Sequence, residues 1–377
     1  MRIAISGRGV VTTHGSGVDR AWEALLRGLP GGDPVAADGA QFAARIPSAY
    51  RPHSSIPASA IGDMDAGALL AVESSLQALD EASLENPPGG SGRVAIADGL
   101  AFRAPGQGTL FVPYGEALAR MLGVNGSVVE LGGGEASGGA AVAAGMRLIE
   151  SHAADAVIAG AAQVLQPSLI KHLRDQGQLT SGHSTPFDEA NPGCVPGEGS
   201  AFFVLEAPDV AVTRGARVSA YLTGIGEAFD PAAEPLARAS ARSVGFALQS
   251  ALAEAGIVQD QVDLVVICAD GRPAVDRCES TALRRVFGKR AFDHPVVSTA
   301  AGSFGSTLAA SGPLALSAAV EAMVHQEVFP VARGPGSRPE VGLAIATKAE
   351  PMRIDCAVVL VTGTGGSSNS FVLERST

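Results

Sequence analysis

The chain has 377 residues, enough for two to three domain-sized units of about 150 residues each. It is 46% hydrophobic and only 17% charged, and its 27 Lys and Arg residues against 38 Asp and Glu residues give a net charge of −11. An acidic balance of this size argues against nucleic acid and against anionic membrane surfaces as partners, because both attract basic surfaces. The apolar composition favours buried helices and an extensive subunit interface.

The four cysteines show no spacing typical of a metal site. They are Cys194, Cys268, Cys278 and Cys356. We therefore expect no structural zinc or other metal, and thiols kept in a reducing cytoplasm. The first residues, MRIAISGRG, lack the apolar run of a signal peptide, and charged residues interrupt the most apolar stretch at Arg147, Glu150 and Asp155. A cytoplasmic globular protein without a membrane span is expected.

Short β-rich runs alternate along the chain with Ala- and Leu-rich runs, a pattern typical of α/β proteins in which helices cover parallel sheets. The first series predicts strands at 2–5, 93–97, 127–131 and 156–159, with helices at 17–26 and 136–151. The second predicts strands at 201–205, 218–225, 264–267, 296–298, 356–362 and 370–373, with helices at 236–255, 279–287 and 312–325. Residues 30–60 and 332–352, rich in Pro, Gly and Ala, are expected to be surface loops.

The two series have the same order, and each contains a glycine-rich turn that leads into a helix of small residues. These turns are at 132–139 and 302–312. The pattern indicates a structural duplication, with an N-terminal half at 1–206 and a C-terminal half at 207–377.

No motif predicts a cofactor. Gly7-Arg8-Gly9 resembles the start of a dinucleotide loop, but the third glycine and a helix at the right offset are missing, so a tight turn after the first strand is expected. The glycine-rich stretch 362–370 could cradle an anion through its amides, and a turn between the last two strands is the favoured interpretation.

Several segments together carry a family resemblance. They are RIAISGRGVVT at 2–12, WEALLRG at 22–28, ADAVIAGAA at 154–162, PFD at 186–188, GEGS at 197–200 and TGTGG at 362–366. In this order they resemble the β-ketoacyl synthases. The resemblance implies a thiolase-like αβαβα fold of five layers built from two related halves, which dimerises through the sheet of the first half.

The reaction centre departs from that family. The turn that holds the family's nucleophilic cysteine reads Gly-Gly-Glu-Ala-Ser-Gly here, which places Glu135 at the cysteine position. A thiolate at a helix start is stabilised by the helix amides and accepts an acyl chain. A carboxylate suits the same electrostatic position but forms no stable thioester.

The other catalytic positions are also changed. Cys268 stands where the family has its first histidine, in a segment that aligns without gaps up to Asp276. Ala301 and Ser306 replace the family's lysine and second histidine, and Thr364 replaces the gating phenylalanine. Because both oxyanion-stabilising histidines are missing, condensation and malonyl decarboxylation are not expected.

Three roles are open for the Glu135 carboxylate. It could cap the helix and fill the space of the lost thiol, act as a general base, or be solvated and idle. A helix start would keep the carboxyl acidic, which makes it a poor base near neutral pH.

The pattern is similar to the chain length factors of type II polyketide synthases, which are inactive homologues paired with an active ketosynthase. It implies a heterodimer with a cysteine-bearing ketosynthase, served by an acyl carrier protein, that shapes the cavity of the growing chain. Glutamate in place of the glutamine usual in aromatic-type factors suggests a branch that serves reduced or polyene chains. The implied tunnel wall contains Phe111, with Leu110, Phe102 and Thr364 as further candidates. The carrier protein, acidic in this family, is expected to dock mainly on the partner.

Two alternatives remain from other classes. One is a thiolase-fold enzyme that uses Glu135, helped by Cys268 or Ser306, for decarboxylation or acyl transfer. The other is a protein that binds an acyl chain or carrier protein without a ketosynthase partner.

Overall fold

The computed structural model describes residues 2–34, 42–48, 50–84, 93–102, 111–188, 192–232, 240–332, 342–363 and 365–376. Within these residues, twelve strands join in one mixed sheet that runs through both halves of the chain. Short β-branched and aromatic runs form these strands, as the sequence predicts.

The first half of the sheet has parallel strands at its edge and antiparallel strands toward the middle. From the edge, the order is β8 (Val128–Leu131), β5 (Val94–Gly99), β9 (Ala156–Gln163), β10 (Gly199–Glu206) and β1 (Ile3–Thr12). Strand β5 pairs in parallel with β8 and β9, and β10 pairs antiparallel with β9 and β1.

The second half repeats this arrangement. Its order is β13 (Val296–Thr299), β12 (Leu264–Ile267), β17 (Cys356–Thr362), β18 (Ser367–Arg375) and β11 (Ala220–Phe229). The parallel and antiparallel pairings follow the same sequence as in the first half, with β15 (Ala344–Ile345) added beyond β13. Strands β1 and β11 pair antiparallel, with Ile3 opposite Leu222, and so connect the halves. The predicted α/β fold of two related halves is confirmed, and the boundary at residue 206 stays a prediction.

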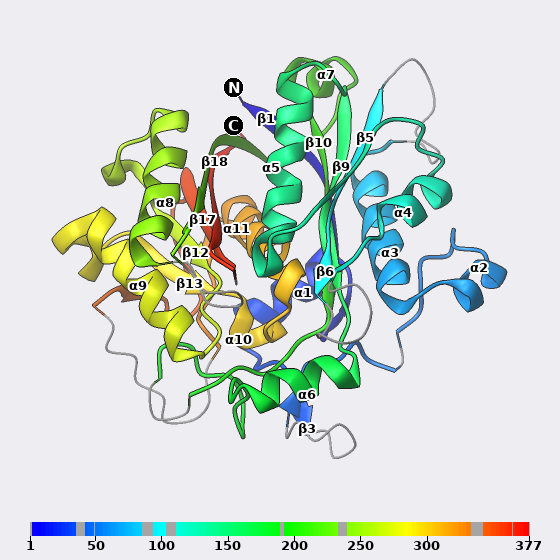
Figure 1. Ribbon diagram of the computed structural model, residues 1–377. Coiled ribbons are helices and arrows are strands. Elements are labelled where there is room, and N and C mark those ends of the chain that lie inside the picture. Colours follow the sequence, from blue (N-terminus) through cyan, green and yellow to red (C-terminus); the bar gives the residue numbers. More distant parts are fainter. Residues whose placement is uncertain are drawn as a thin grey trace.

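The helices form three layers around the two parts of the sheet (Figure 1). Helices α5 (Ser137–Glu150) and α11 (Ser311–His325) lie between them, with α3 (Ala66–Glu81) and α4 (Gly115–Leu122) outside the first half and α8 (Ala241–Ala255) and α9 (Pro273–Phe287) outside the second. The remaining helices are α1 (Val18–Leu26), α2 (Ala58–Asp63), α6 (Pro167–Asp175), α7 (Pro208–Thr213) and α10 (Ala301–Phe304). Short strands are β2 (Gly15–Ser16), β3 (Asp33–Pro34), β4 (Phe42–Ala43), β6 (Ala101–Phe102), β7 (Phe111–Val112), β14 (Glu327–Val328) and β16 (Glu350–Pro351). The layers thus follow the predicted αβαβα order.

The central helix α11 belongs to a long apolar stretch of the described chain. By length and composition alone, Leu308–His325 could cross a membrane, and 83% of this stretch is buried inside the molecule. Its burial between the sheet halves accounts for its hydropathy, because a helix apolar on all sides fits the centre of a large core.

Two glycines of β1 allow α3 to lie directly on the strand. A Cβ at Gly7 would overlap the carbonyl oxygen of Ala78, and one at Gly9 would overlap that of Ser74. The predicted turn at Gly7-Arg8-Gly9 is therefore wrong: these residues lie inside a ten-residue strand. They serve a close approach of backbones rather than a bend.

Candidate functional site

Glu135 lies at the start of the central helix α5. It belongs to a single 3₁₀ turn, Gly134–Ala136, that leads directly into Ser137. The side chain is buried, with 6% exposed, which excludes the one of the three open roles in which it is solvated and idle. Gly363, directly after β17, packs against this 3₁₀ turn, since a Cβ at Gly363 would lie 2.8 Å from the Cβ of Ala136.

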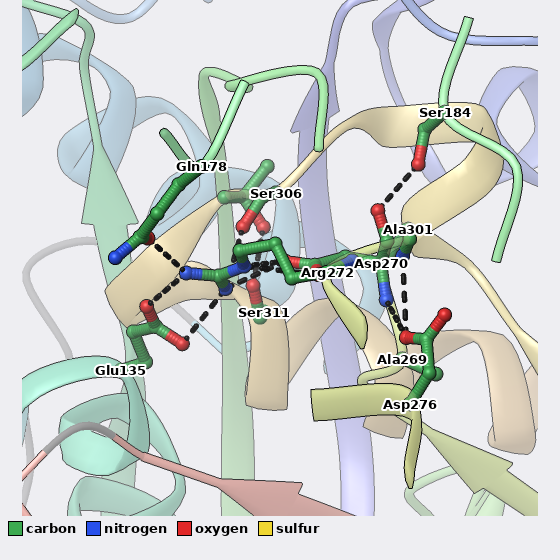
Figure 2. A network of polar contacts seen from close by, with 12 residues as sticks. Glu135, Gln178, Ser184, Ala269, Asp270, Arg272, Asp276, Ala301, Ser306 and Ser311 are labelled. Carbon is green, nitrogen blue, oxygen red and sulfur yellow. Dashed lines mark hydrogen bonds and ion pairs between the residues drawn. The ribbon is translucent and has the colours of Figure 1, made fainter. Parts of the chain in front are cut away.

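The Glu135 carboxylate is paired with the buried guanidinium of Arg272 (Figure 2). Nη1 of Arg272 donates to one Glu135 oxygen at 3.0 Å, and Nη2 donates to the other at 3.1 Å. Arg272 precedes Pro273, the first residue of α9, so the pair joins the starts of helices from the two halves. Such a two-point pairing fixes both side chains in orientation as well as in charge.

The remaining donors of Arg272 are also used. Its Nε and Nη2 donate to Asp270 at 2.6–3.0 Å, while Gln178 accepts from Nη1 at 3.0 Å and Ser306 from Nη2 at 3.2 Å. Burial by itself would lower the pKa of Arg272, but the charges of Asp270 and Glu135 outweigh it and raise the pKa well above its usual value. The guanidinium therefore stays charged and fully hydrogen-bonded between two carboxylates.

Asp276 holds the backbone that presents Arg272. Its carboxylate accepts from the amides of Asp270 and Gly271 at 3.2 Å and from the amide of Phe187 at 2.6 Å. Burial, and then the charge of Asp270, raises the pKa of Asp276 to about 7. Phe187 has a left-handed φ of 68°, a strained backbone for a bulky residue, and this hydrogen bond helps to hold it.

Cys268 and Ala301 border a small cavity beside this network. The cavity has a volume of about 10 Å³, room for a single water molecule. Its walls also include Phe304, Thr307 and Leu314. Within the described residues, no group of three or more His, Cys, Asp or Glu side chains is arranged to hold a metal ion.

Models of two domains match this chain in sequence order. The β-ketoacyl synthase N-terminal domain matches residues 116–211, and the β-ketoacyl synthase C-terminal domain matches residues 219–334, which together make more than half of the chain. The chain belongs to the β-ketoacyl synthase family. Its resemblance to that family is thereby confirmed.

Relatives include acyl-carrier-protein synthases and polyketide synthase subunits. The 3-oxoacyl-[acyl-carrier-protein] synthase 2 of Coxiella burnetii (strain RSA 493 / Nine Mile phase I) is 27% identical over 99% of this chain and 98% of its own length. The tetracenomycin polyketide synthase ketoacyl synthase alpha subunit of Streptomyces glaucescens is 31% identical over 67% of this chain and 61% of its own length. The ishigamide ketosynthase/chain length factor structure superimposes with a TM-score of 0.85 at 22% identity, covering 100% of this chain and 99% of that chain, and so shares the fold.

The structure brings four of the predicted site residues to one place. Glu135 and Ser306 both bind Arg272, and Cys268 and Ala301 share the small cavity. Of the predicted tunnel residues, Phe102 and Phe111 are paired opposite each other in β6 and β7. The structure describes the backbone of these two residues and not their side chains. Leu110 and Thr364 lie outside the described residues.

The sequence analysis missed the partners of Glu135. Arg272, Asp270 and Gln178 complete the network, yet none was predicted as a site residue. A signal was present, because the alignment that puts Cys268 at the histidine position also puts Arg272 at a threonine of the same family segment. The nucleophile position carries the carboxylate of Glu135 here, and the segment that faces it carries the guanidinium of Arg272. Opposite charges at two facing positions predict an ion pair.

Proposed function

We propose that this protein is a non-catalytic ketosynthase-like subunit, a chain length factor, that pairs with an active ketosynthase and shapes the cavity for a growing polyketide or polyene chain. The observation that carries the proposal is the ion pair of Glu135 and Arg272. The nucleophile position holds no thiol, and its carboxylate is bound at both oxygens to a guanidinium that itself is held by Asp270.

Each replacement in this network removes a catalytic function. A carboxylate bound at two points to a buried cation is a weak nucleophile and a weak base, because its lone pairs are engaged and its charge is compensated. Neither Ala301 nor Ser306 can act as the cation or imidazole that stabilises an enolate oxyanion. The cavity at Cys268, with a volume of about 10 Å³, is the size of one water molecule and is too small for an acyl group.

The partners follow from the family. Relatives are named as acyl-carrier-protein synthases and as a subunit of a polyketide synthase, and one related fold is a ketosynthase with its chain length factor. We infer that this chain works in the cytoplasm with a cysteine-bearing ketosynthase and with an acyl carrier protein that bears the chain. Phe111, Phe102, Leu110 and Thr364 are proposed for the tunnel wall.

The alternative is a catalytic thiolase-fold enzyme. Cys268 is the side chain through which this alternative can be tested. Relatives of this chain are named as synthases, and this thiol stands at the former histidine position on the wall of a cavity. In that case acyl groups would load on Cys268 or depend on Glu135 as a base.

Acyl loading separates the two functions. The complex of this chain with its ketosynthase is incubated with malonyl- and acyl-carrier protein, and the mass of each intact subunit is measured. We expect an acyl adduct on the ketosynthase and none on this chain, and Glu135→Gln to leave turnover within about tenfold of the wild type. An adduct that is lost in Cys268→Ser, or a loss of turnover beyond about 10²-fold in Glu135→Gln, would establish the catalytic alternative.

A further inference from the structure

One of the acidic side chains outside the network of Arg272 is completely buried at the end of a strand. Asp98, at the end of β5, is 0% exposed. Its Oδ2 accepts from the amide of Tyr114 at 2.6 Å, while its Oδ1 has no hydrogen-bond partner within the described residues. Fully buried carboxylates are rare without a cation because desolvation is costly. A chain that keeps one at such a cost uses it for more than packing.

The hydrogen bond of Asp98 closes the base of the β6–β7 hairpin. Asp98 lies three residues before β6, and Tyr114 lies two residues after β7. In between, Phe102 and Phe111 stand opposite each other in the pairing register. A bond between the two stems fixes the spacing and tilt of the strands that carry both phenylalanines.

The same base is in contact with the start of the central helix. A Cβ at Gly99 would lie 2.5 Å from the backbone nitrogen of Gly138, so the strand end and the first turn of α5 touch. The hydroxyl of Ser137 donates to the carbonyl of Leu100 at 3.0 Å. The hairpin is therefore anchored on one side to the helix that begins after Glu135 and on the other to Asp98.

Within the described part of the chain, the charged groups that act on Asp98 are acidic. Glu130 of the edge strand β8 is its neighbour in register, and Glu116 in the first turn of α4 acts on Glu130. On the other side, β9 contributes Gly160, which has no charge. Burial, together with the charge of Glu130, raises the pKa of Asp98 to about 7.

We propose that Asp98 is a positioning residue that sets the geometry of the β6–β7 hairpin and through it the length of the chain that the complex makes. This inference rests on the proposed function. Above neutral pH the ionised carboxylate holds the amide of Tyr114 strongly, and below neutral pH the protonated group holds it less. The hairpin is thus held most firmly on the alkaline side of neutrality.

The test compares product lengths at pH 6 and pH 8 in the complete complex of this chain, its ketosynthase and the acyl carrier protein. The wild type is expected to make a narrower range of lengths at pH 8 than at pH 6. Asp98→Asn, which has the same shape and no titration, is expected to give one distribution at both pH values, and Asp98→Ala a broader one at both. The matched control is Asp209→Asn, an exposed residue of α7 that should behave as the wild type.

Hydrogen exchange in the same complexes gives a readout that does not depend on turnover. The amides of 111–115 should exchange about tenfold faster in Asp98→Ala than in the wild type at pH 8, and Asp98→Asn should restore most of the protection. Unchanged product lengths in an active Asp98→Ala complex would overturn the role of Asp98 and leave the proposed function standing. A product distribution that does not depend on this chain at all would overturn the proposed function and this inference with it.

Discussion

The side chain at the former nucleophile position is understood through the residue that it contacts. Glu135 alone would be a buried charge at a helix start, and Arg272 alone would be a buried cation; together with Asp270 they form a set with one positive and two negative charges. That Glu135 stands where the family has its cysteine is a prediction from the turn in which it lies, because that turn is local in sequence. Its partner, 137 residues away, could not be predicted in this way, because pairing at that separation depends on how the two halves pack.

Removal of Arg272 is expected to destabilise the protein strongly. Arg272→Met keeps much of the side-chain volume but removes the guanidinium that pairs with the buried carboxylates of Glu135 and Asp270, and the loss of one partner of a buried ion pair typically costs about 3–5 kcal/mol. The free energy of unfolding in urea measures this loss. Arg120→Met serves as the control, since the pair of Arg120 with Glu116 is exposed and contributes about 0.5 kcal/mol or less. A loss below about 1 kcal/mol for Arg272→Met would contradict the view that this ion pair holds the two halves together.

At the scale of elements, some predicted strands and helices match the structure closely and others do not. The strands expected at 264–267 and 356–362 match β12 and β17 at both ends, since continuous β-branched runs are typical of strands buried on both faces. Helix α9 begins at Pro273, six residues before the predicted start, because proline suits the first turn of a helix. Helix α3 was not predicted: it buries Glu73, Ser74 and Ser75 along with its apolar residues, so the amphipathic period that marks a surface helix is weak.

The close contact of α3 with β1 predicts that a methyl group added to a glycine of β1 destabilises the protein. Gly9→Ala would push a Cβ into the carbonyl of Ser74, so the helix must move away from the strand or the variant must fail to fold. We expect a loss of about 3 kcal/mol or more in the free energy of unfolding, measured by thermal or urea denaturation. Gly62→Ala in α2 is the matched control, because nothing lies within 4 Å of the added Cβ. That variant should gain about 0.5–1 kcal/mol from helix propensity, and equal stabilities of the two variants would contradict the close packing of α3.

At the scale of the whole molecule, the duplication was the most predictable property. Two series of strands and helices in the same order gave the five layers, because each series folds by the same rules of parallel pairing and helical cover. What the series could not predict is the antiparallel pairing of β1 with β11, which joins the two parts in one sheet. That pairing depends on the ends of strands from different halves meeting in space.

The edge of this sheet gives the last prediction, which concerns assembly. Strand β8 pairs with β5 on one side only within the described chain, and Val128 is 37% exposed there. An edge with free backbone groups and a partly exposed apolar residue favours pairing with another chain. The family resemblance implies that the heterodimer forms through the sheet of this half, so we expect Val128→Lys to weaken the complex with the ketosynthase at least about tenfold, measured by light scattering and by titration of the purified subunits. Val212→Lys is the control, because Val212 is 67% exposed on α7 and should leave the affinity unchanged. If both variants bind the ketosynthase as the wild type does, the interface lies elsewhere on the molecule, and the tunnel wall proposed near β6 and β7 would not face the partner.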